Sequence, residues 1–259
     1  MDVIGEAAAQ LSRRIEGGGT PEADWLGWPG LAAARRLSLN EWLPQGVRLV
    51  VVAPHPDDEV LACGGLLASH TARGGACLVV AVTDGEASHA GSSTLTPADL
   101  ARTRRVESSE GLQTLGLRRG DIARFGLPDG RVERNLSKLV SGLHLVLQPT
   151  DVVVSTWRLD GHPDHEATGR AVATVCARTG CRFMEAPVWM WHWAEPGDPR
   201  LPWHRLMGFD LDETALAAKR QALAAHASQL APRDGIEAWP VLGPTILDRV
   251  ARRTEFFFA

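Results

Sequence analysis

The sequence predicts an α/β fold in which a mostly parallel sheet carries helices on both faces. Three observations support this prediction. Short apolar runs of strand length alternate with longer helical segments from residue 48 to about residue 180, as in consecutive β-α-β units. Glycines follow several of the helical segments, where helices usually stop. Polar clusters containing histidine come directly after two of the apolar runs, where ligands bind in parallel sheets.

The central elements follow from the hydrophobic runs and their boundaries. Apolar runs predict strands over residues 48–53, 77–82, 122–125 and 151–156. The segments between and after them predict helices over residues 58–73, 97–115, 135–147 and 166–179. Residues 83–96 are polar and glycine-rich, and they predict a loop.

The first part of the chain is expected to form an appendage that packs on this core. Residues 1–45 are broken by a run of three glycines and carry three tryptophans that would anchor them, namely Trp25, Trp28 and Trp42. We therefore expect a single domain over residues 1–259, with its core over residues 46–259. A length of 259 residues and an apolar content of 44% are enough for such a core.

The last part of the chain is expected to add a strand, a helix and a final strand. Tryptophans at alternate positions would share one face of a strand over residues 187–193; they are Trp189, Trp191 and Trp193. Residues 212–230 predict a helix, and the aromatic run at residues 256–258 predicts a buried strand. Core packing explains the alternating tryptophans, and a wall for stacking against sugars is the alternative.

Composition and charge argue against several classes of function. The formal net charge is −4 and no long Lys/Arg run occurs, which argues against nucleic acid as a partner. No run of 18 apolar residues is present, and the first ten residues lack the apolar core of a signal peptide. We therefore expect a cytoplasmic protein without a membrane span. The four cysteines form no Cys-x-x-Cys pair, so we expect buried free thiols. The oligomeric state stays open.

Two histidine–carboxylate clusters are the most informative feature of the chain. Residues 53–59 read Ala-Pro-His-Pro-Asp-Asp-Glu, and residues 160–165 read Asp-Gly-His-Pro-Asp-His. Each cluster follows a predicted strand, so two strand ends can bring both to one edge of the sheet. Together they supply three histidines and several carboxylates, enough for one catalytic metal ion and the acid–base groups beside it.

Three of these residues are candidate metal ligands. His55 and Asp58 lie three positions apart across the turn from strand to helix, and His165 supplies a third ligand from the second cluster. Two imidazoles and one carboxylate suit Zn²⁺, and they also suit Fe²⁺ or another divalent ion. Asp58 stands at the start of a predicted helix, where the helix dipole favours a carboxylate anion.

The remaining residues of the clusters are candidates for catalysis. Asp57 would accept a proton from the attacking water, and His162 would stabilise an oxyanion or protonate the departing amine. Asp164 would hold His162 in the required tautomer and raise its pKa. Each also has a structural alternative: Asp57 and Asp164 as helix caps, and His162 as a surface loop histidine. The coincidence of two clusters at two strand ends favours the metal site.

At these residues the chain resembles the PIG-L (LmbE-like) family of metal-dependent de-N-acetylases. The resemblance continues in the family's order through residues 83–86, 127–130 and 219–229, and it covers roughly residues 48–230. It implies a Rossmann-like fold and substrates of the N-acetylglucosamine type. It also implies roles for five residues of the two clusters, with zinc bound by His55, Asp58 and His165, Asp57 as the general base, and His162 as the electrostatic or acid group.

The resemblance also implies two substrate contacts. Arg104 and Asp129 match family positions that reach the sugar. The alternatives are a helix pair between Arg104 and Glu107 and a turn role for Asp129 within its Pro-Asp-Gly sequence. Some relatives place a mobile tyrosine over the metal, but this chain has no tyrosine. That role is therefore vacant or filled by another residue.

The expected function is metal-dependent removal of an N-acetyl or N-acyl group from an N-acetylglucosamine-type sugar or glycoconjugate. The expected partner is a small acetylated amino sugar. The alternatives are another metal-dependent amide or ester hydrolase, a phosphoesterase, and a catalytically silent metal-binding protein. A nucleotide-binding module is disfavoured, because no Gly-x-Gly-x-x-Gly or Walker-type loop follows the first predicted strand.

Overall fold

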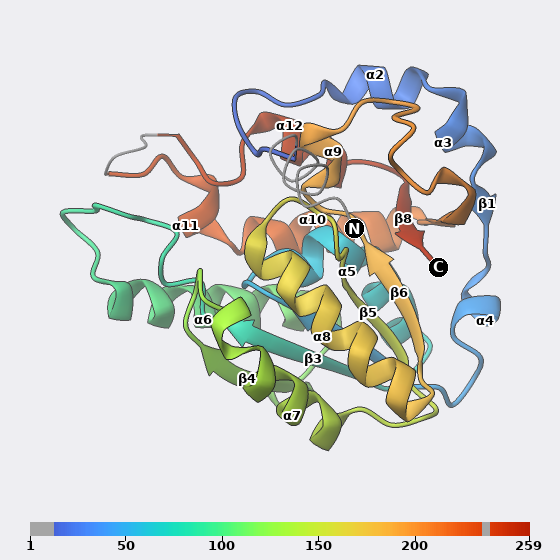
Figure 1. Ribbon diagram of the computed structural model, residues 1–259, viewed down its shortest axis with the longest axis horizontal. Coiled ribbons are helices and arrows are strands. Elements are labelled where there is room, and N and C mark those ends of the chain that lie inside the picture. The colour runs from blue at the N-terminus through green and yellow to red at the C-terminus, as the bar shows by residue number, and fades with distance from the viewer. Residues whose placement is uncertain (1–12, 235–238) are drawn as a thin grey trace, which may run out of the picture.

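The computed structural model describes residues 13–234 and 239–259, and the expectation for the first ten residues lies outside these ranges. Within the described residues, eight strands form one sheet in the order β1-β7-β8-β6-β5-β2-β3-β4. Figure 1 shows this sheet among the helices. The strands are β1 (Arg35–Arg36), β2 (Leu49–Ala53), β3 (Cys77–Thr83), β4 (Ile122–Leu127), β5 (Val152–Thr156), β6 (Arg182–Ala186), β7 (Leu206–Asp210) and β8 (Thr254–Phe258). Only β8 pairs antiparallel with its neighbours in this sheet. The predicted, mostly parallel sheet is confirmed.

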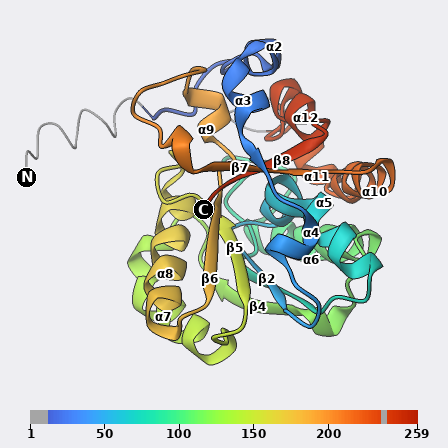
Figure 2. The ribbon, with the colours of Figure 1, turned by 90° about the vertical axis from the view of Figure 1, so that its right-hand side faces the viewer.

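Helices cover both faces of this sheet, as predicted. Figure 2 shows α7 (Leu136–Val146) and α8 (Pro163–Thr179) on one face, and α5 (Asp58–Ala72), α6 (Pro97–Thr114) and α10 (Glu213–Ala224) on the other. Alternate residues of β2 enter two separate cores: Val50 and Val52 pack toward α7 and α8, whereas Leu49 and Val51 pack toward α5, α6 and α10. Burial on both sides explains why the central strands are continuous apolar runs.

The remaining elements are short. They are α2 (Glu22–Gly27), α3 (Pro29–Ala33), α4 (Leu39–Trp42), α9 (Met190–Trp193), α11 (Ala227–Leu230), α12 (Pro244–Val250) and three 3₁₀ turns, η1 (Arg119–Asp121), η2 (Glu133–Asn135) and η3 (Trp203–Arg205). In the described part of the chain, no helix has both the length and the apolar character needed to cross a bilayer.

The order of the strands creates a crevice at the centre of the sheet. From β2 the chain continues to β3 and β4 on one side, and it then crosses to β5 and β6 on the other. The strands β2 and β5 are parallel neighbours in register, with Val52 opposite Ser155. Their carboxyl ends therefore meet at one edge, and the loops that follow them diverge. The point where successive strands change from one side of β2 to the other is the topological switch point, and open α/β sheets bind ligands there.

The N-terminal segment packs on the core through tryptophans. Trp25 is fully buried, and its Nε1 donates a hydrogen bond of 3.0 Å to the carbonyl of Trp191. The two rings meet edge to face with centroids 5.0 Å apart, an arrangement favourable for aromatic pairs. The segment also adds β1 to the edge of the sheet, parallel to β7.

The predicted strand over residues 187–193 is wrong. The chain turns there and forms the short helix α9. The cause is the buried carboxylate of Asp160, which accepts the backbone N–H groups of Val188, Trp189 and Met190 at 2.9, 3.0 and 2.9 Å. A carboxylate that accepts the free N–H groups at the start of a helix stabilises it. As a result Trp191 joins the core with Trp25, whereas Trp189 lines the cavity that also contains the three histidines of the two clusters.

Candidate active site

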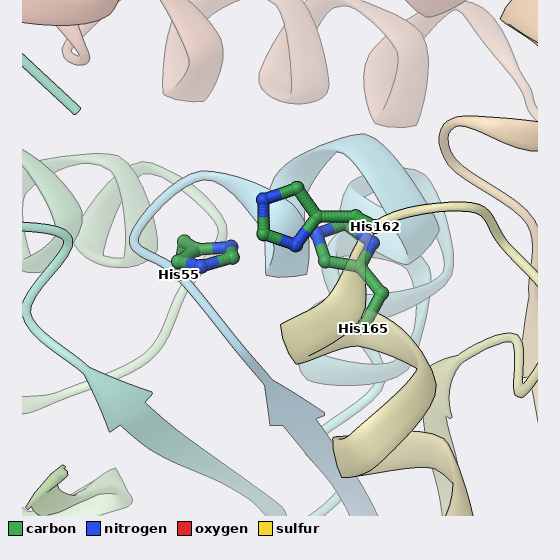
Figure 3. A group of neighbouring side chains, drawn as sticks. All are labelled: His55, His162 and His165. Atoms are coloured by element: carbon green, nitrogen blue, oxygen red, sulfur yellow. The ribbon is translucent and has the colours of Figure 1, made fainter. Parts of the chain in front are cut away.

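The loops after β2 and β5 bring the three histidines of the two clusters together. His55 lies in the loop between β2 and α5, whereas His162 and His165 lie at the start of α8 (Figure 3). Ring centroids are 4.9 Å apart for His55 and His162, 5.3 Å for His55 and His165, and 4.8 Å for His162 and His165. The imidazoles are therefore close enough to share one ion.

Asp58 lies between two of these imidazoles. Its Oδ2 atom is 3.1 Å from Nδ1 of His55 and 3.2 Å from Nε2 of His165. The structure thus brings together His55, Asp58 and His165. Potential ligand atoms lie within 4.8 Å of one another in two sets, His55 with His162 and His165, and His55 with Asp129 and Asp164. His162 is thus an additional possible donor.

The electrostatics of the site favour a cation. Burial alone would lower the pKa of His55, but hydrogen bonds with Asp129, Asp164 and Asp58 raise that pKa well above its ordinary value. Burial likewise opposes the charged form of His165, yet Asp58 and the other nearby carboxylates raise its pKa to about 9. The surrounding carboxylates thus stabilise positive charge at this point. Imidazole nitrogens and carboxylate oxygens are also the donors that Zn²⁺ and similar divalent ions take in proteins.

Asp160 supports the metal-site histidine His165, a role that the sequence did not reveal. Its Oδ2 atom lies 2.8 Å from Nδ1 of His165, and the carboxylate is fully buried. Because a carboxylate can only accept, Nδ1 carries the proton and Nε2 is left to face Asp58. A carboxylate behind a histidine is a common support for a metal ligand. The only sequence signal was the position of Asp160 at the start of the second cluster.

Asp57 occupies a strained backbone conformation. Its φ of 122° makes it the only non-glycine residue with positive φ in the described ranges. Its side chain caps no helix, so the alternative of a helix-capping Asp57 is wrong. The conformation is held from both sides, since Arg104 donates to Oδ2 at 3.1 Å and the Asp57 N–H donates to Glu59 at 3.1 Å. Strain of this kind is concentrated at functional sites.

The protonation of Asp57 also differs from that of an ordinary carboxyl group. Burial and the negative charges of Asp58 and Glu59 raise its pKa, and the opposing charge of Arg104 limits the rise to about 7. A carboxyl group with a pKa near 7 can both accept and return a proton at neutral pH. The two adjacent carboxylates therefore differ, because the neighbouring imidazoles lower the pKa of Asp58 despite its burial.

Arg104 holds the first cluster in place. Its buried guanidinium donates to the carbonyls of Gly85 and Pro56 at 2.8 and 2.6 Å, as well as to Asp57. Glu107 instead accepts from the backbone and side chain of Ser228, at 2.7 and 2.6 Å. The alternative of a helix pair between Arg104 and Glu107 is therefore wrong. Arg104 also lines the cavity of the site, and its contact with a sugar stays a prediction.

His162 and Asp164 do not interact as expected. The Asp164 carboxylate accepts the N–H groups of Gly130 and Val132, at 2.7 and 3.1 Å, and lies 3.4 Å from Nε2 of His55. It neither orients the His162 ring nor caps α8. Instead Nδ1 of His162 accepts the N–H of Asp164 at 3.2 Å, so His162 itself caps α8.

The same arrangement sets the charge state of His162. Burial and the neighbouring imidazoles His165 and His55 lower the pKa of His162 to about 3. The expectation of a raised pKa is therefore wrong, and the ring is neutral near pH 7. Because Nδ1 accepts a backbone N–H, the proton of the neutral ring lies on Nε2. His162 is thus a neutral hydrogen-bond donor.

Asp129 contacts His55 from the loop after β4. Its Oδ1 atom lies 3.1 Å from Nε2 of His55, and its Oδ2 accepts the N–H of Ala87 at 2.8 Å. Although burial opposes the change, the hydrogen bond from His55 brings the pKa of Asp129 down to about 2. The residue therefore faces the predicted metal ligand as a carboxylate, and its contact with a sugar hydroxyl stays a prediction.

A kink in α5 is supported by a buried ion pair. Cys63 has non-helical dihedrals inside the helix, so the turn that carries Asp58 is separated from the rest. Glu255 accepts the N–H groups of Gly65 and Leu66, both at 2.8 Å. Lys219 donates to Glu255 at 2.6 Å and to the carbonyl of Leu61 at 3.2 Å. The pair thus satisfies backbone groups on both sides of the kink.

These residues surround a cavity of about 280 Å³. Its volume is close to the lower end of small-molecule sites, about 300–1,000 Å³. All three histidines line it together with Asp57 and Asp58, and its outer wall includes Trp189, Gln229, Arg233 and Val241. The predicted ligands, the proposed base and a neutral donor therefore open onto one space.

Part of the chain is similar to known proteins. Residues 50–176 match the PIG-L family model, described as GlcNAc-PI de-N-acetylase. The 1D-myo-inositol 2-acetamido-2-deoxy-alpha-D-glucopyranoside deacetylase of Corynebacterium diphtheriae is 29% identical over 225 residues, covering 71% of this chain and 77% of that protein. The probable N-acetyl-alpha-D-glucosaminyl L-malate deacetylase 2 of Bacillus anthracis is 29% identical over 199 residues, covering 71% of this chain and 82% of that protein.

A solved structure shares the architecture. An antimicrobial reagent pseudoaglycone deacetylase, known from a crystal structure, is 25% identical in sequence to this chain and has a TM-score of 0.60. The match covers 82% of this chain and 96% of that chain. The two histidine–carboxylate clusters both lie inside the matched residues 50–176. The matched residues 50–176, which hold both clusters and the strands β3, β4 and β5, are therefore similar to the PIG-L (LmbE-like) family.

Proposed function

We propose that this protein is a metal-dependent hydrolase that removes an N-acetyl or longer N-acyl group from an N-acetylglucosamine-type sugar or glycoconjugate. The observation that carries the proposal is the buried, strained Asp57 beside the group of His55, Asp58 and His165. Metal binding alone would need only ligands, whereas Asp57 is a carboxyl group suited to proton transfer. The two relatives, both described as deacetylases of acetylated glucosaminyl compounds, support the substrate class.

Three residues would hold the metal ion, namely His55, Asp58 and His165. We propose Zn²⁺, with Fe²⁺ as the alternative, because both accept two imidazoles and one carboxylate. When bound, such an ion supplies Lewis acidity that polarises an amide carbonyl and lowers the pKa of a water molecule. Asp160 keeps the Nε2 atom of His165 available by accepting the proton of Nδ1.

Asp57 would perform the proton transfers. We assign the proton of the attacking water to Oδ1, because Oδ2 accepts the hydrogen bond of Arg104. A pKa near 7 for Asp57 lets the same group return that proton to the departing amine. The products would be the carboxylic acid, acetate in the simplest case, and the free amino sugar.

His162 would stabilise the oxyanion through a neutral hydrogen bond from Nε2. Its Nδ1 atom is engaged by the backbone of Asp164, so the ring presents a fixed donor to the cavity. Loss of one such donor typically slows catalysis by about 10²–10³-fold. We further propose that Arg104 and Asp129 contact the sugar. We also propose that the whole chain forms a single domain.

The test is acetate release from N-acetylglucosamine glycosides by protein loaded with one metal at a time. We expect turnover with Zn²⁺ or Fe²⁺, its loss after chelation, and its recovery when the metal is returned. Asp57→Asn is expected to lower this turnover. The matched control is Asp248→Asn, at an exposed position of α12, which is expected to leave it unchanged. Metal binding without hydrolysis of any acetylated amino sugar would overturn the proposed function.

A further inference from the structure

A second and larger cavity opens beside the metal site. It has a volume of about 790 Å³, against about 280 Å³ for the metal cavity. We call it the outer cavity; it is lined by residues 15–18, by Trp189, His192 and Arg233, and by residues 239–241 and 243–246. Trp189, Arg233 and Val241 line both cavities. The two cavities are therefore adjacent and share part of their wall.

The walls of the two cavities are tied together. The N–H of Trp189 donates to Oδ2 of Asp160 at 3.0 Å, and the same oxygen lies 2.8 Å from Nδ1 of His165. On the other side, Arg233 donates to the carbonyl of Ser88 in the metal cavity at 2.9 Å and to that of Trp239 in the outer cavity at 2.8 Å. These hydrogen bonds therefore hold the walls of the two cavities in fixed positions relative to each other.

The chemistry of the outer cavity is mainly apolar and aromatic. Besides Trp189 and Val241, its wall includes Ile15, Trp239 and Ile246, and its charged side chains are few. Trp239 is 81% exposed, so it contributes little to the core. An exposed tryptophan in the wall of a cavity offers a rigid, flat surface for an apolar group of a ligand.

We propose that the outer cavity binds an apolar aglycone, an aromatic or alkyl group carried on the anomeric carbon of the acetylated amino sugar. The acetamido group would lie in the metal cavity, and the aglycone would leave it past Trp189 and contact Trp239. This inference rests on the proposed function and narrows its substrate class. An acetylated monosaccharide alone would occupy only the smaller of the two adjacent cavities.

The experiment compares methyl and hexyl glycosides of N-acetylglucosamine as substrates of the metal-loaded protein. We expect kcat/KM to be at least about tenfold higher for the hexyl glycoside, because five additional methylenes leave water. Trp239→Ala is expected to lower this hexyl-to-methyl ratio at least fivefold. Leu145→Ala, which removes another exposed apolar side chain (88% exposed) on α7, is expected to leave the ratio unchanged.

Calorimetric binding of the two glycosides provides a readout that does not depend on turnover. The hexyl glycoside is expected to bind at least about tenfold more tightly, and Trp239→Ala to remove most of this difference. Equal kcat/KM and equal affinity for both glycosides would overturn the inference while leaving the hydrolase intact. Absence of hydrolysis for every glycoside would instead overturn the proposed function, and the affinities would still decide on the outer cavity.

Discussion

The Oδ2 atom of Asp160 lies 2.8 Å from Nδ1 of His165 and accepts the backbone N–H of Trp189 at 3.0 Å. One buried carboxylate thus orients a predicted metal ligand and fixes the wall of the site. The same carboxylate forms the N-terminal cap of α9 through Val188 and Met190. The second histidine–carboxylate cluster is therefore joined to the tryptophan-rich part of the chain through Asp160.

Replacing Asp160 is expected to weaken metal binding. In Asp160→Asn the side chain keeps its size but loses its charge, so His165 is less basic and less firmly oriented. Changes of this kind typically reduce metal affinity by about 10–100-fold. Titration against a competing chelator measures the effect. Asp198→Asn is the control, since Asp198 is also buried but lies outside the metal cavity; equal affinities in both variants would refute the role of Asp160.

Replacing Asp57 is expected to separate catalysis from metal binding. Asparagine tolerates positive φ better than most residues, so Asp57→Asn should fold despite the backbone angle of 122°. Loss of a general base usually lowers the rate by about 10²–10⁴-fold. We expect this loss in kcat together with an unchanged metal content of one ion per chain. Full activity in this variant would remove Asp57 from the mechanism.

The buried ion pair at the kink of α5 is expected to be important for stability. Lys219→Met would leave Glu255 charged, buried and without its cation, which typically costs about 3–5 kcal/mol. The exposed pair between Arg253 and Glu213 provides a control, because breaking a surface pair costs about 0–1 kcal/mol. Chemical denaturation of Lys219→Met and Arg253→Met measures both costs. Similar losses in the two variants would contradict the support of the kink by Lys219.

His226 is expected to make the protein less stable in acid. Within the described part of the chain, its fully buried ring has no hydrogen-bond partner at either nitrogen. Burial, together with the nearby charge of Arg104, lowers the pKa of His226 from 6.5 to about 3. Between these values the unfolded chain binds a proton that the folded protein excludes. The stability that depends on the neutral His226 ring is therefore fully present above pH 6.5. As the pH falls below 6.5, the free energy of unfolding drops by roughly 1 kcal/mol per pH unit.

The variant His226→Gln isolates this contribution. Its free energy of unfolding should fall less steeply than that of the wild type between pH 6.5 and pH 4, whatever the offset at pH 7. The exposed His204→Gln serves as the control and should follow the wild-type curve. Parallel curves for wild type and His226→Gln would show that the buried ring does not account for the acid sensitivity.

The fold could be predicted because its signals are local. Fully buried parallel strands such as β2 are continuous apolar runs, and their regular alternation with helices indicates a mostly parallel sheet covered on both faces. The meeting of His55 with His165 was also predictable, since both follow the carboxyl ends of strands. In each case the pattern lies within a few consecutive residues.

The partners of individual side chains could not be predicted in the same way. Asp160 stabilises α9 across about 30 positions, and this contact overrides the alternating tryptophans that indicated a strand. Asp164 turns to Gly130 and Val132, because the loop after β4 presents free N–H groups there. Arg104 likewise turns to Asp57 from a separate helix. Such contacts depend on how distant segments pack, which no local pattern encodes.

The most direct test of the central claim is a crystal structure of the metal-loaded protein with anomalous scattering recorded at the zinc edge. The account predicts one anomalous peak per chain, coordinated by His55, Asp58 and His165, with Asp57 beside it and not bound. A peak at another place, or a fully loaded protein whose ion lacks any of these three ligands, would contradict it.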